Sequence, residues 1–254
     1  MNNSFIDKLK LKWDEGKFVC VGLDSSDFSL LQKIVNDTFD YVCAYKINSA
    51  FFEVEGADGW ESLKKLIQYI HTTYPDIPII LDAKRGDIGN TNEAYAKAIF
   101  DDLQADAVTV HPYLGKESLE PFLKRADKGI FILVRTSNPG AGEFQDLKTG
   151  DKPLYQVVAQ HVKDWDTNNN LAVVVGATYP EELKKVREIV GDMPILVPGI
   201  GAQGGDLKAV LNNGLDTKKQ GLIISVSRAI LNAEDPKKTA GELHNQIKEI
   251  IQNV

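Results

Sequence analysis

The sequence lacks any apolar run close to the roughly 18 residues that a membrane-spanning helix requires. Its N-terminal segment, MNNSFIDKLKLKWDEG, also lacks the apolar core and the small-residue cleavage site of a signal peptide. An excess of positive charge is missing too, because the net charge is −7. An acidic surface of this kind does not favour nucleic acid or anionic membranes. We therefore expect a cytoplasmic protein that binds neither nucleic acid nor membrane.

Cysteine is scarce: the chain has only Cys20 and Cys43, both within apolar runs that we interpret as strands. Cysteines in such runs usually pack as small hydrophobic side chains, so we assign them no chemistry. The composition, 43% hydrophobic and 26% charged, is typical of a globular protein with a large core. A length of 254 residues suits one α/β barrel, which predicts a single domain over residues 1–254.

Short apolar segments rich in β-branched residues recur along the chain. They cover residues 18–24, 41–48, 77–84, 107–112, 129–136, 171–178, 194–201 and 221–228. Continuous apolar runs are typical of parallel strands that are buried on both faces. Amphipathic segments separate them: residues 61–74 place apolar side chains on one helix face, and residues 90–103 begin with a capping-box pattern from Asn90 to Glu93. Eight such units predict an α/β fold, a single (β/α)8 TIM barrel.

The main alternative is an open, doubly wound sheet of the Rossmann type. The first apolar run is followed by GLDSSDF rather than by a GxGxxG turn, so dinucleotide binding loses its best support. A long glycine-rich connection over residues 137–152 fits either a binding loop or a surface excursion. An N-terminal helix with Phe5, Leu9 and Trp13 on one side could either close the bottom of the barrel, which is the commoner outcome, or meet a partner.

Polar residues gather at the C-terminal ends of the predicted strands, where barrels of this type carry their active sites. They are Asp24, Lys46, Asn48, Asp82, Lys84, His111, Thr136, Ser137 and Thr178. Alternate residues of a strand share a face, so Asp82 and Lys84 are expected to point together toward the mouth of the barrel. Ala83 and Arg85 should then point toward the helices, while His111 is expected to line or pack the mouth without a catalytic role.

Two segments after the last two predicted strands favour a phosphate site. Residues 199–206, GIGAQGGD, allow backbone N–H groups to approach an anion, and Gln203 adds a side-chain donor. Arg228 follows the last strand at the start of a short helix, and its planar fork suits phosphate. Each segment alone is a weak indication, but barrels commonly bind phosphate at these two positions.

Several segments together resemble orotidine 5'-phosphate decarboxylases, and the resemblance covers essentially the whole chain. It rests on YKINSAFFE with Lys46, DAKRGDIGNT, SNPG, PGIGAQGGD and the final SR, and it is closest to the bacterial branch with the DAKRGDI motif. This resemblance implies decarboxylation of orotidine 5'-phosphate to uridine 5'-phosphate and CO2 in pyrimidine biosynthesis. It also implies that no metal, cofactor or covalent intermediate takes part.

The resemblance further implies a set of site residues: Lys46, Asp82, Lys84 and Asp87 as the catalytic array, and Asp24, Thr91, Ser137, Pro198, Gly201, Gln203 and Arg228 in substrate binding. Lys84 would stabilise the carbanion at C6 and protonate it. Asp24 and Lys46 would hold the ribose, Ser137 the pyrimidine, and Gln203 with Arg228 the phosphate, in a loop shaped by Pro198 and Gly201. Asp87 and Thr91 would reach the neighbouring subunit's site in a homodimer with shared active sites. Asp82 could act by repelling the substrate carboxylate or by positioning Lys84.

Alternative interpretations remain open at this point. A metal-dependent decarboxylase of a sugar-phosphate keto acid would need carboxylates around magnesium, where Lys46 would repel the ion. A non-catalytic nucleotide-phosphate sensor would be expected to have lost part of the charged array. Asp82 and Lys84 could form a structural ion pair. Asp24 could serve as a turn cap and Ser137 as a loop cap, and Thr91 could simply be part of the N-terminal turn of its helix.

Overall fold

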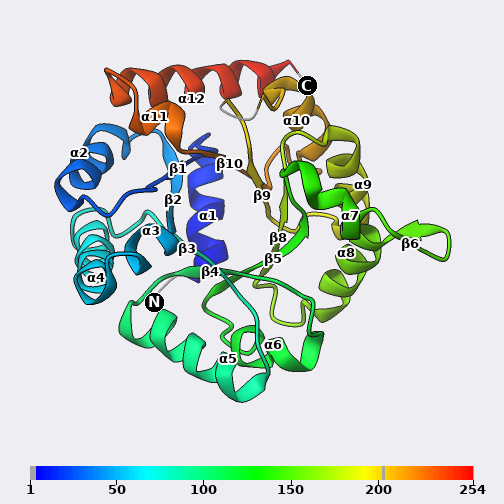
Figure 1. Cartoon of the computed structure of the whole chain (residues 1–254). Coiled ribbons are helices and arrows are strands. Elements are labelled where there is room, and N and C mark those ends of the chain that lie inside the picture. Colours follow the sequence, from blue (N-terminus) through cyan, green and yellow to red (C-terminus); the bar gives the residue numbers. More distant parts are fainter. Residues whose placement is uncertain (1–3, 202–203, 254) are drawn as a thin grey trace.

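Eight parallel strands close into a barrel in the computed structural model, which describes residues 4–201 and 204–253. Their order around the barrel is β1-β10-β9-β8-β5-β4-β3-β2 (Figure 1). The strands are β1 (Val19–Gly22), β2 (Val42–Asn48), β3 (Ile79–Arg85), β4 (Ala107–Val110), β5 (Gly129–Arg135), β8 (Leu171–Val175), β9 (Ile195–Pro198) and β10 (Leu222–Val226). Because β1 pairs with both β2 and β10, the sheet has no open edge, which confirms the predicted TIM barrel and rules out the Rossmann alternative.

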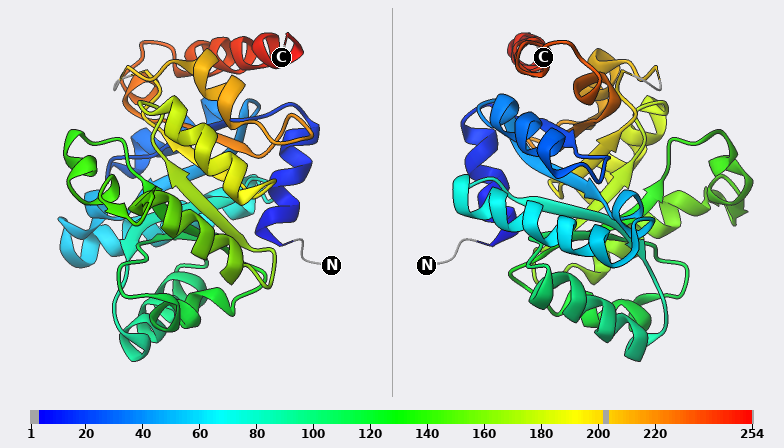
Figure 2. Two further views of the ribbon diagram at one scale, coloured as in Figure 1. Left: turned by 90° about the vertical axis from the view of Figure 1, so that its right-hand side faces the viewer. Right: turned by 60° about the vertical axis from the view of Figure 1, so that its left-hand side comes forward.

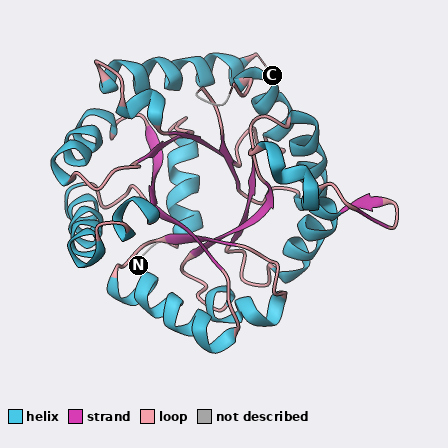
Figure 3. Cartoon of the chain, in the orientation of Figure 1, coloured by secondary structure: helices cyan, strands magenta, loops and turns pink. Residues whose placement is uncertain are grey.

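A ring of helices covers the outside of the barrel (Figure 3). They are α2 (Phe28–Thr38), α3 (Ala50–Glu53), α4 (Gly56–Thr73), α5 (Gly89–Ala96), η1 (Lys97–Asp102), α6 (Lys116–Leu123), α8 (Leu154–Trp165), α9 (Pro180–Val190), α10 (Leu207–Gly214), α11 (Arg228–Leu231) and α12 (Pro236–Gln252). The predicted apolar face of α4 is buried, with Leu63, Leu66, Ile67 and Ile70 against the core. None of these helices, nor any other in the described ranges, is long and apolar enough to cross a membrane.

The predicted capping box of α5 is wrong. The helix begins at Gly89, and its N-cap, Ile88, makes no side-chain cap bond. Glu93 therefore lies beyond the first turn, and its carboxylate accepts a hydrogen bond from Lys124 Nζ at 2.9 Å instead. The side chain of Glu93, which the local pattern assigned to the cap, thus contacts the end of α6 instead.

Helix α1 (Phe5–Asp14) closes the N-terminal end of the barrel, which is the commoner of the two outcomes that the sequence left open. Ser4 caps it in a capping box with Asp7. Trp13 Nε1 donates a hydrogen bond to the carbonyl of Leu222 at 2.9 Å, and the ring of Phe5 meets Phe131 edge-on with centroids 5.5 Å apart. The helix lies across the centre of the ring of strands in Figure 1, so its apolar face seals the core.

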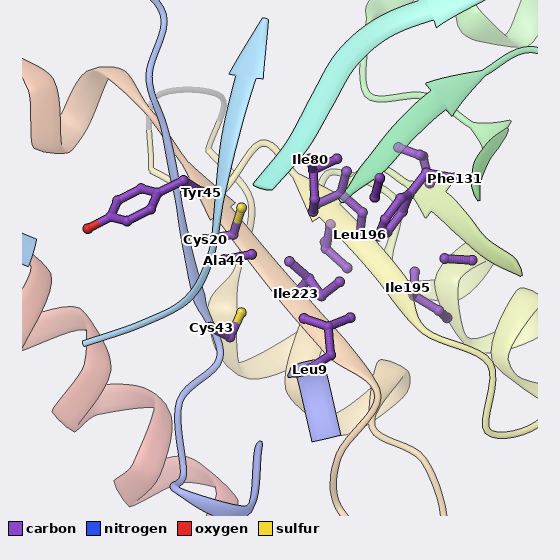
Figure 4. Packing of buried hydrophobic residues seen from close by; sticks show 14 of the residues in the cluster. Leu9, Cys20, Cys43, Ala44, Tyr45, Ile80, Phe131, Ile195, Leu196 and Ile223 are labelled. Carbon is purple, nitrogen blue, oxygen red and sulfur yellow. The ribbon is translucent and has the colours of Figure 1, made fainter. Parts of the chain in front are cut away.

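Both cysteines belong to this core. Figure 4 shows Cys20 and Cys43 on neighbouring strands, near Ala44 and above Leu9 of α1. Both are fully buried, and burial raises the pKa of the Cys20 thiol to about 12. They therefore stay protonated and pack as small apolar side chains, as expected.

The long connection after β5 has secondary structure of its own. It contains a 3-10 turn, η2 (Pro139–Ala141), the short helix α7 (Gly142–Gln145) and an antiparallel pair, β6 (Lys148–Thr149) with β7 (Lys152–Pro153). The pair projects outward from the barrel in Figure 1. Figure 2 shows this segment and α1 at opposite ends of the molecule, which places the connection at the mouth.

Candidate active site

A cluster of charged side chains lies at the mouth of the barrel, at the C-terminal ends of β2 and β3. Asp82 is at its centre: its Oδ2 lies 3.1 Å from Lys46 Nζ, and its Oδ1 lies 2.7 Å from Lys84 Nζ. Asp24, which follows β1, lies with Oδ1 at 4.0 Å from Lys46 Nζ. The structure thus brings together three members of the predicted catalytic array and both predicted ribose ligands, since Lys46 belongs to both sets.

The cluster is stable only with its charges paired. Burial alone would raise the pKa of Asp82, which is 8% exposed, but Lys46, Lys84 and the hydrogen bonds to its carboxylate lower it to about 2. Burial likewise opposes the charge on Lys46, yet Asp82 and Asp24 raise its pKa above the ordinary value. Asp82 and Lys46 are therefore ionised at neutral pH. The side chain of Lys84 is 49% exposed, so its ammonium is held by Asp82 and also faces the open mouth.

Lys84 is also held through its backbone. Its φ of 45° lies in the left-handed region, which side chains other than glycine rarely adopt. The β3–β4 pairing shifts register between Leu81 and Arg85, and the Lys84 N–H donates to Thr109 Oγ1 at 2.9 Å. Backbone strain of this kind often accompanies function.

Thr109 is a residue that the sequence prediction missed. Its hydroxyl also donates to Asp82 Oδ1 at 2.9 Å, so one buried side chain fixes both the carboxylate and the strained backbone. A signal was available, since Thr109 lies two residues before His111 and thus shares its strand face.

The side chain that follows the cluster, Arg85, points away from it, as the alternation predicted. Arg85 turns toward the helices, where its guanidinium contacts Glu53 and lies 5.0 Å from the ring centroid of Tyr95. His111 packs against the backbone of Gly86, so closely that a Cβ on that glycine would lie 2.2 Å from Nε2. This position agrees with the packing role expected for His111.

Asp87 is the one member of the predicted array that lies outside the cluster in the single chain. Among the described residues, no ion pair joins it to a lysine. Its Oδ1 accepts from the N–H of Ile88 at 2.7 Å, and buried Asn92 holds its backbone through hydrogen bonds of 3.1 and 2.6 Å. Asn92 was not predicted, and no sequence signal distinguished it. Thr91 lies in the first turn of α5.

Asp24 keeps a free acceptor at the mouth. Its Oδ1 is buried and has no hydrogen-bond partner within the described part of the chain. The capping of the following helix, α2, is done by Asp27, which accepts from the N–H groups of Ser29 and Leu30. The turn-capping alternative for Asp24 is therefore not supported, and its carboxylate is available to a hydroxyl donor.

The two predicted phosphate segments lie side by side. The loop after β9 runs from Pro198 through Gly199, at φ 106°, and Gly201, at φ 78°, which only glycine adopts without strain. A Cβ on Gly201 would lie 3.7 Å from that of Ala229, next to Arg228. Arg228 is exposed and begins α11, so its guanidinium is available at the mouth. Gln203 lies outside the described residues.

Ser137 follows β5 on the same mouth. Its Cα packs against Gly176, where an added Cβ would lie 2.6 Å away, and its carbonyl accepts from Thr178 Oγ1 at 3.5 Å. Pro198 pairs with Ser225 at the end of the β9–β10 ladder. The predicted phosphate ligands that the structure describes thus lie at the adjacent ends of β9 and β10, and the predicted ring ligand lies after β5, with β8 between them.

A metal centre finds little support in this arrangement. Within residues 4–201 and 204–253, no group of three or more histidine, cysteine, aspartate or glutamate side chains is placed to hold a metal ion. The carboxylates at the mouth are instead paired with Lys46 and Lys84, whose charges oppose a cation.

A parallel barrel whose mouth combines a lysine–carboxylate cluster with a glycine-rich loop defines a (β/α)8-barrel enzyme. The comparison with protein families is more specific: residues 17–243 match the orotidine 5'-phosphate decarboxylase / HUMPS family. The chain belongs to this family, which confirms the resemblance found in its motifs. Its assignment to the bacterial branch with the DAKRGDI motif stays a prediction.

Relatives of known name and structure agree. The chain is 48% identical over 245 residues to orotidine 5'-phosphate decarboxylase of Ralstonia pickettii, covering 90% of both chains. It resembles Leishmania donovani OMP decarboxylase with a TM-score of 0.93 and 41% identity, over 98% of this chain and 99% of that one. Leishmania donovani UMP synthase matches with a TM-score of 0.94 and 42% identity over 98% of this chain, which spans 57% of that longer protein. These names do not favour the sugar-phosphate or sensor alternatives.

Proposed function

We propose that the protein decarboxylates orotidine 5'-phosphate to uridine 5'-phosphate and CO2, without metal or cofactor. The observation that carries the proposal is the Lys46–Asp82–Lys84 cluster: a half-exposed ammonium, fixed at 2.7 Å by a buried carboxylate, at the active end of a barrel. The family membership and the decarboxylase relatives support the same reaction.

The reaction needs positive charge at one carbon. When the bond from C6 to the carboxylate breaks, its electron pair stays on C6 and CO2 leaves. The ammonium of Lys84 stabilises that carbanion and then transfers a proton to it, giving uridine 5'-phosphate, and the lysine recovers a proton from solvent. Asp82 positions the ammonium through its 2.7 Å contact. Its repulsion of the substrate carboxylate is a second contribution of the same group.

The rest of the substrate extends across the mouth. Asp24, with an acceptor oxygen that lacks a partner among the described residues, takes a ribose hydroxyl together with Lys46. Ser137 contacts the pyrimidine, and the loop of Pro198 and Gly201 receives the phosphate with Arg228 and the predicted ligand Gln203. Binding energy from the phosphate is remote from C6, so it can be used to orient the reacting carbon.

The proposal includes a homodimer of single-domain subunits that share their active sites. The absence of an Asp87–lysine ion pair from the described chain supports it, because a second subunit would bring Asp87 and Thr91 to the cluster. Ile88, Tyr113 and Leu114 are exposed apolar side chains on the adjoining loops, and they supply surface that a partner would cover.

The test of the reaction is the ultraviolet absorbance of orotidine 5'-phosphate mixed with the protein in excess EDTA, with unphosphorylated orotidine as the control. We expect loss of the orotate chromophore, formation of uridine 5'-phosphate, and an almost inert control. Activity that appears only when magnesium replaces EDTA would instead support the metal-dependent alternative. Tight binding without turnover by a folded protein would support the sensor.

The shared site is tested by mixing two inactive variants, Lys84→Ala and Asp87→Ala. A hybrid dimer has one site that retains both residues, so mixing should restore part of the activity. If subunit exchange is demonstrated and no activity returns, each subunit carries a complete site and the shared-site proposal fails.

A further inference from the structure

The long connection after β5 is tied back to the strand end from which it starts. Arg135, the last residue of β5, donates from Nε and Nη2 to the two carboxylate oxygens of Asp146, at 2.9 and 3.0 Å. The next residue, Thr136, donates its N–H to Gln145 Oε1 at 2.8 Å, and its hydroxyl accepts from Gln145 Nε2 at 3.0 Å. We call these four residues, Arg135, Thr136, Gln145 and Asp146, the loop clamp.

The loop clamp is built around a buried charge. Arg135 is 2% exposed, and its guanidinium lies 3.9 Å from the ring centroid of Tyr179. Nη1 donates to the carbonyl of Thr136 at 2.9 Å, so the head group is held by hydrogen bonds and by an aromatic face. Gly142 leaves room for the carboxylate: a Cβ there would lie 2.6 Å from Asp146 Oδ2. A guanidinium fixed on several sides can act as a rigid anchor for the connection.

Ser137 lies directly after the clamped residues. On one side, Arg135 and Thr136 precede it and are held by Asp146 and Gln145. On the other side, its Cα packs against Gly176, whose N–H donates to the carbonyl of Arg135 at 2.8 Å. The backbone of Ser137 is therefore set by the loop clamp in front and by the β8 end behind.

We propose that Asp146 and Gln145 are positioning residues that hold Ser137 for recognition of the substrate's pyrimidine ring. The inference rests on the proposed function of Ser137 and extends it to the connection over residues 137–152, which the sequence left undecided between a binding loop and a surface excursion. The loop clamp reaches the substrate only through Ser137. Loss of the clamp should thus harm ring recognition and leave phosphate recognition at Arg228 intact.

A double-mutant cycle between Asp146→Asn and Ser137→Ala tests this relation. Displacement of a reacting group by about 1 Å can cost about 100-fold, so we expect each single variant to lower kcat/KM for orotidine 5'-phosphate by about 10- to 100-fold. If Asp146 acts through Ser137, the kcat/KM of the double variant should be no lower than that of the less active single variant. Multiplication of the two losses would overturn the proposal.

A binding measurement separates positioning from general damage to the fold. Calorimetry with Asp146→Asn should show weaker binding of uridine 5'-phosphate and unchanged binding of ribose 5-phosphate, which lacks the ring. Equal weakening of both ligands would contradict the proposal. These ligands also distinguish failure of the proposed reaction from failure of the loop-clamp proposal. If the wild-type protein binds both ligands but does not decarboxylate orotidine 5'-phosphate, the proposed reaction is refuted and the loop-clamp proposal is not.

The control is a second bidentate pair, Arg125 with Asp101, which is more exposed and is joined at 2.7 and 2.8 Å near the bottom of the barrel. Asp101→Asn should leave both kcat/KM and ligand binding unchanged. If Asp146→Asn does not fold, Gln145→Ala takes its place in the cycle and in the calorimetry, since Gln145 carries no charge to leave unpaired. A folded Gln145→Ala variant with wild-type kcat/KM and wild-type ring binding would overturn the proposal.

Discussion

Asp82 at the mouth of the barrel and Asp106 at its bottom have closely similar surroundings. Asp82 contacts Lys46 and Lys84 at 3.1 and 2.7 Å and accepts from Thr109 at 2.9 Å. Asp106 contacts Lys8 and His71, each at 2.9 Å, and accepts from the N–H of Ile79 at 2.9 Å. In both cases burial opposes ionisation, the partners outweigh it, and the carboxyl pKa falls to about 2.

The partners of the two aspartates differ in the elements from which they come and in their exposure. Those of Asp106 come from α1, α4 and the start of β3, so the carboxylate joins three elements at the closed end. Those of Asp82 come from strand ends, and one of them, Lys84, is half exposed on strained backbone. In addition, a cavity of about 610 Å³ lies beside Asp106, and Asp82 does not line it. A lowered pKa and a large cavity therefore do not identify the active end. Lys84 distinguishes the mouth, because its half-exposed ammonium is held on strained backbone beside a buried carboxylate.

The strongest test of this comparison pairs Lys84→Ala with Lys8→Ala, because each removes one lysine from an aspartate. Lys84→Ala should lower kcat by about 10⁴-fold or more, since both charge stabilisation and proton transfer are lost. Lys8→Ala should leave kcat unchanged and lower the melting temperature by a few degrees, about the effect of 1 kcal/mol in a chain of this size. Steady-state kinetics and thermal unfolding measure both. Wild-type turnover by Lys84→Ala would reject the assignment of the mouth.

Removing the carboxylates themselves should separate activity from stability. Asp82→Asn and Asp106→Asn each break a largely buried ion pair, so each should cost about 2 kcal/mol in unfolding free energy. Only Asp82→Asn should also lower kcat, by about 100- to 1000-fold, because Lys84 loses the group that positions it. Urea unfolding and kinetics on both variants check this. A loss of kcat in Asp106→Asn comparable to that of Asp82→Asn would mean that the two ends are coupled.

The sequence allowed the barrel and most of the mouth to be predicted for a physical reason. Strand-end position and side-chain alternation depend only on local order along the chain, so Asp82 and Lys84 could be placed together and Arg85 on the other face. The predicted capping box of α5 was wrong, because Glu93 instead pairs with Lys124, which lies on another element. Thr109, Asn92 and the loop clamp were missed because their partners come from segments whose spacing no local pattern fixes.

The dependence of stability on pH should be alike at the two ends. The pKa of Asp106 is about 2 in the folded protein against an ordinary value of 3.8. A lowered folded-state pKa stabilises the protein above the ordinary value, and this contribution, about 2 kcal/mol, disappears as pH falls through the folded-state value. The free energy of unfolding should therefore differ between wild type and Asp106→Asn at about pH 6 and converge toward about pH 2. Asp82→Asn should behave in the same way, and a constant difference at all pH values would contradict the ion-pair account.

The smallest expected effect concerns the third donor to each carboxylate. At the bottom this donor is the main-chain N–H of Ile79, whereas at the mouth it is the hydroxyl of Thr109, which mutation can remove. Thr109→Val keeps the shape and leaves the Lys84 N–H without its acceptor, so we expect a loss of about 1 kcal/mol in stability. Because Asp82 and Lys84 are then held less firmly, kcat should fall by several-fold.

A second buried threonine supplies the matched control for this change. The hydroxyl of Thr38 donates to the carbonyl of Ile34 at 2.7 Å and lies 3.0 Å from Tyr45 Oη, away from the charged cluster. Thr38→Val should cost a similar amount of stability, about 1 kcal/mol, with kcat unchanged. If both valine variants lower kcat equally, the loss reflects general loosening of the barrel, and Thr109 has no special part in holding Lys84. A decrease confined to Thr109→Val would show that the mouth differs from the bottom in using a side chain, rather than the main chain, to position its carboxylate.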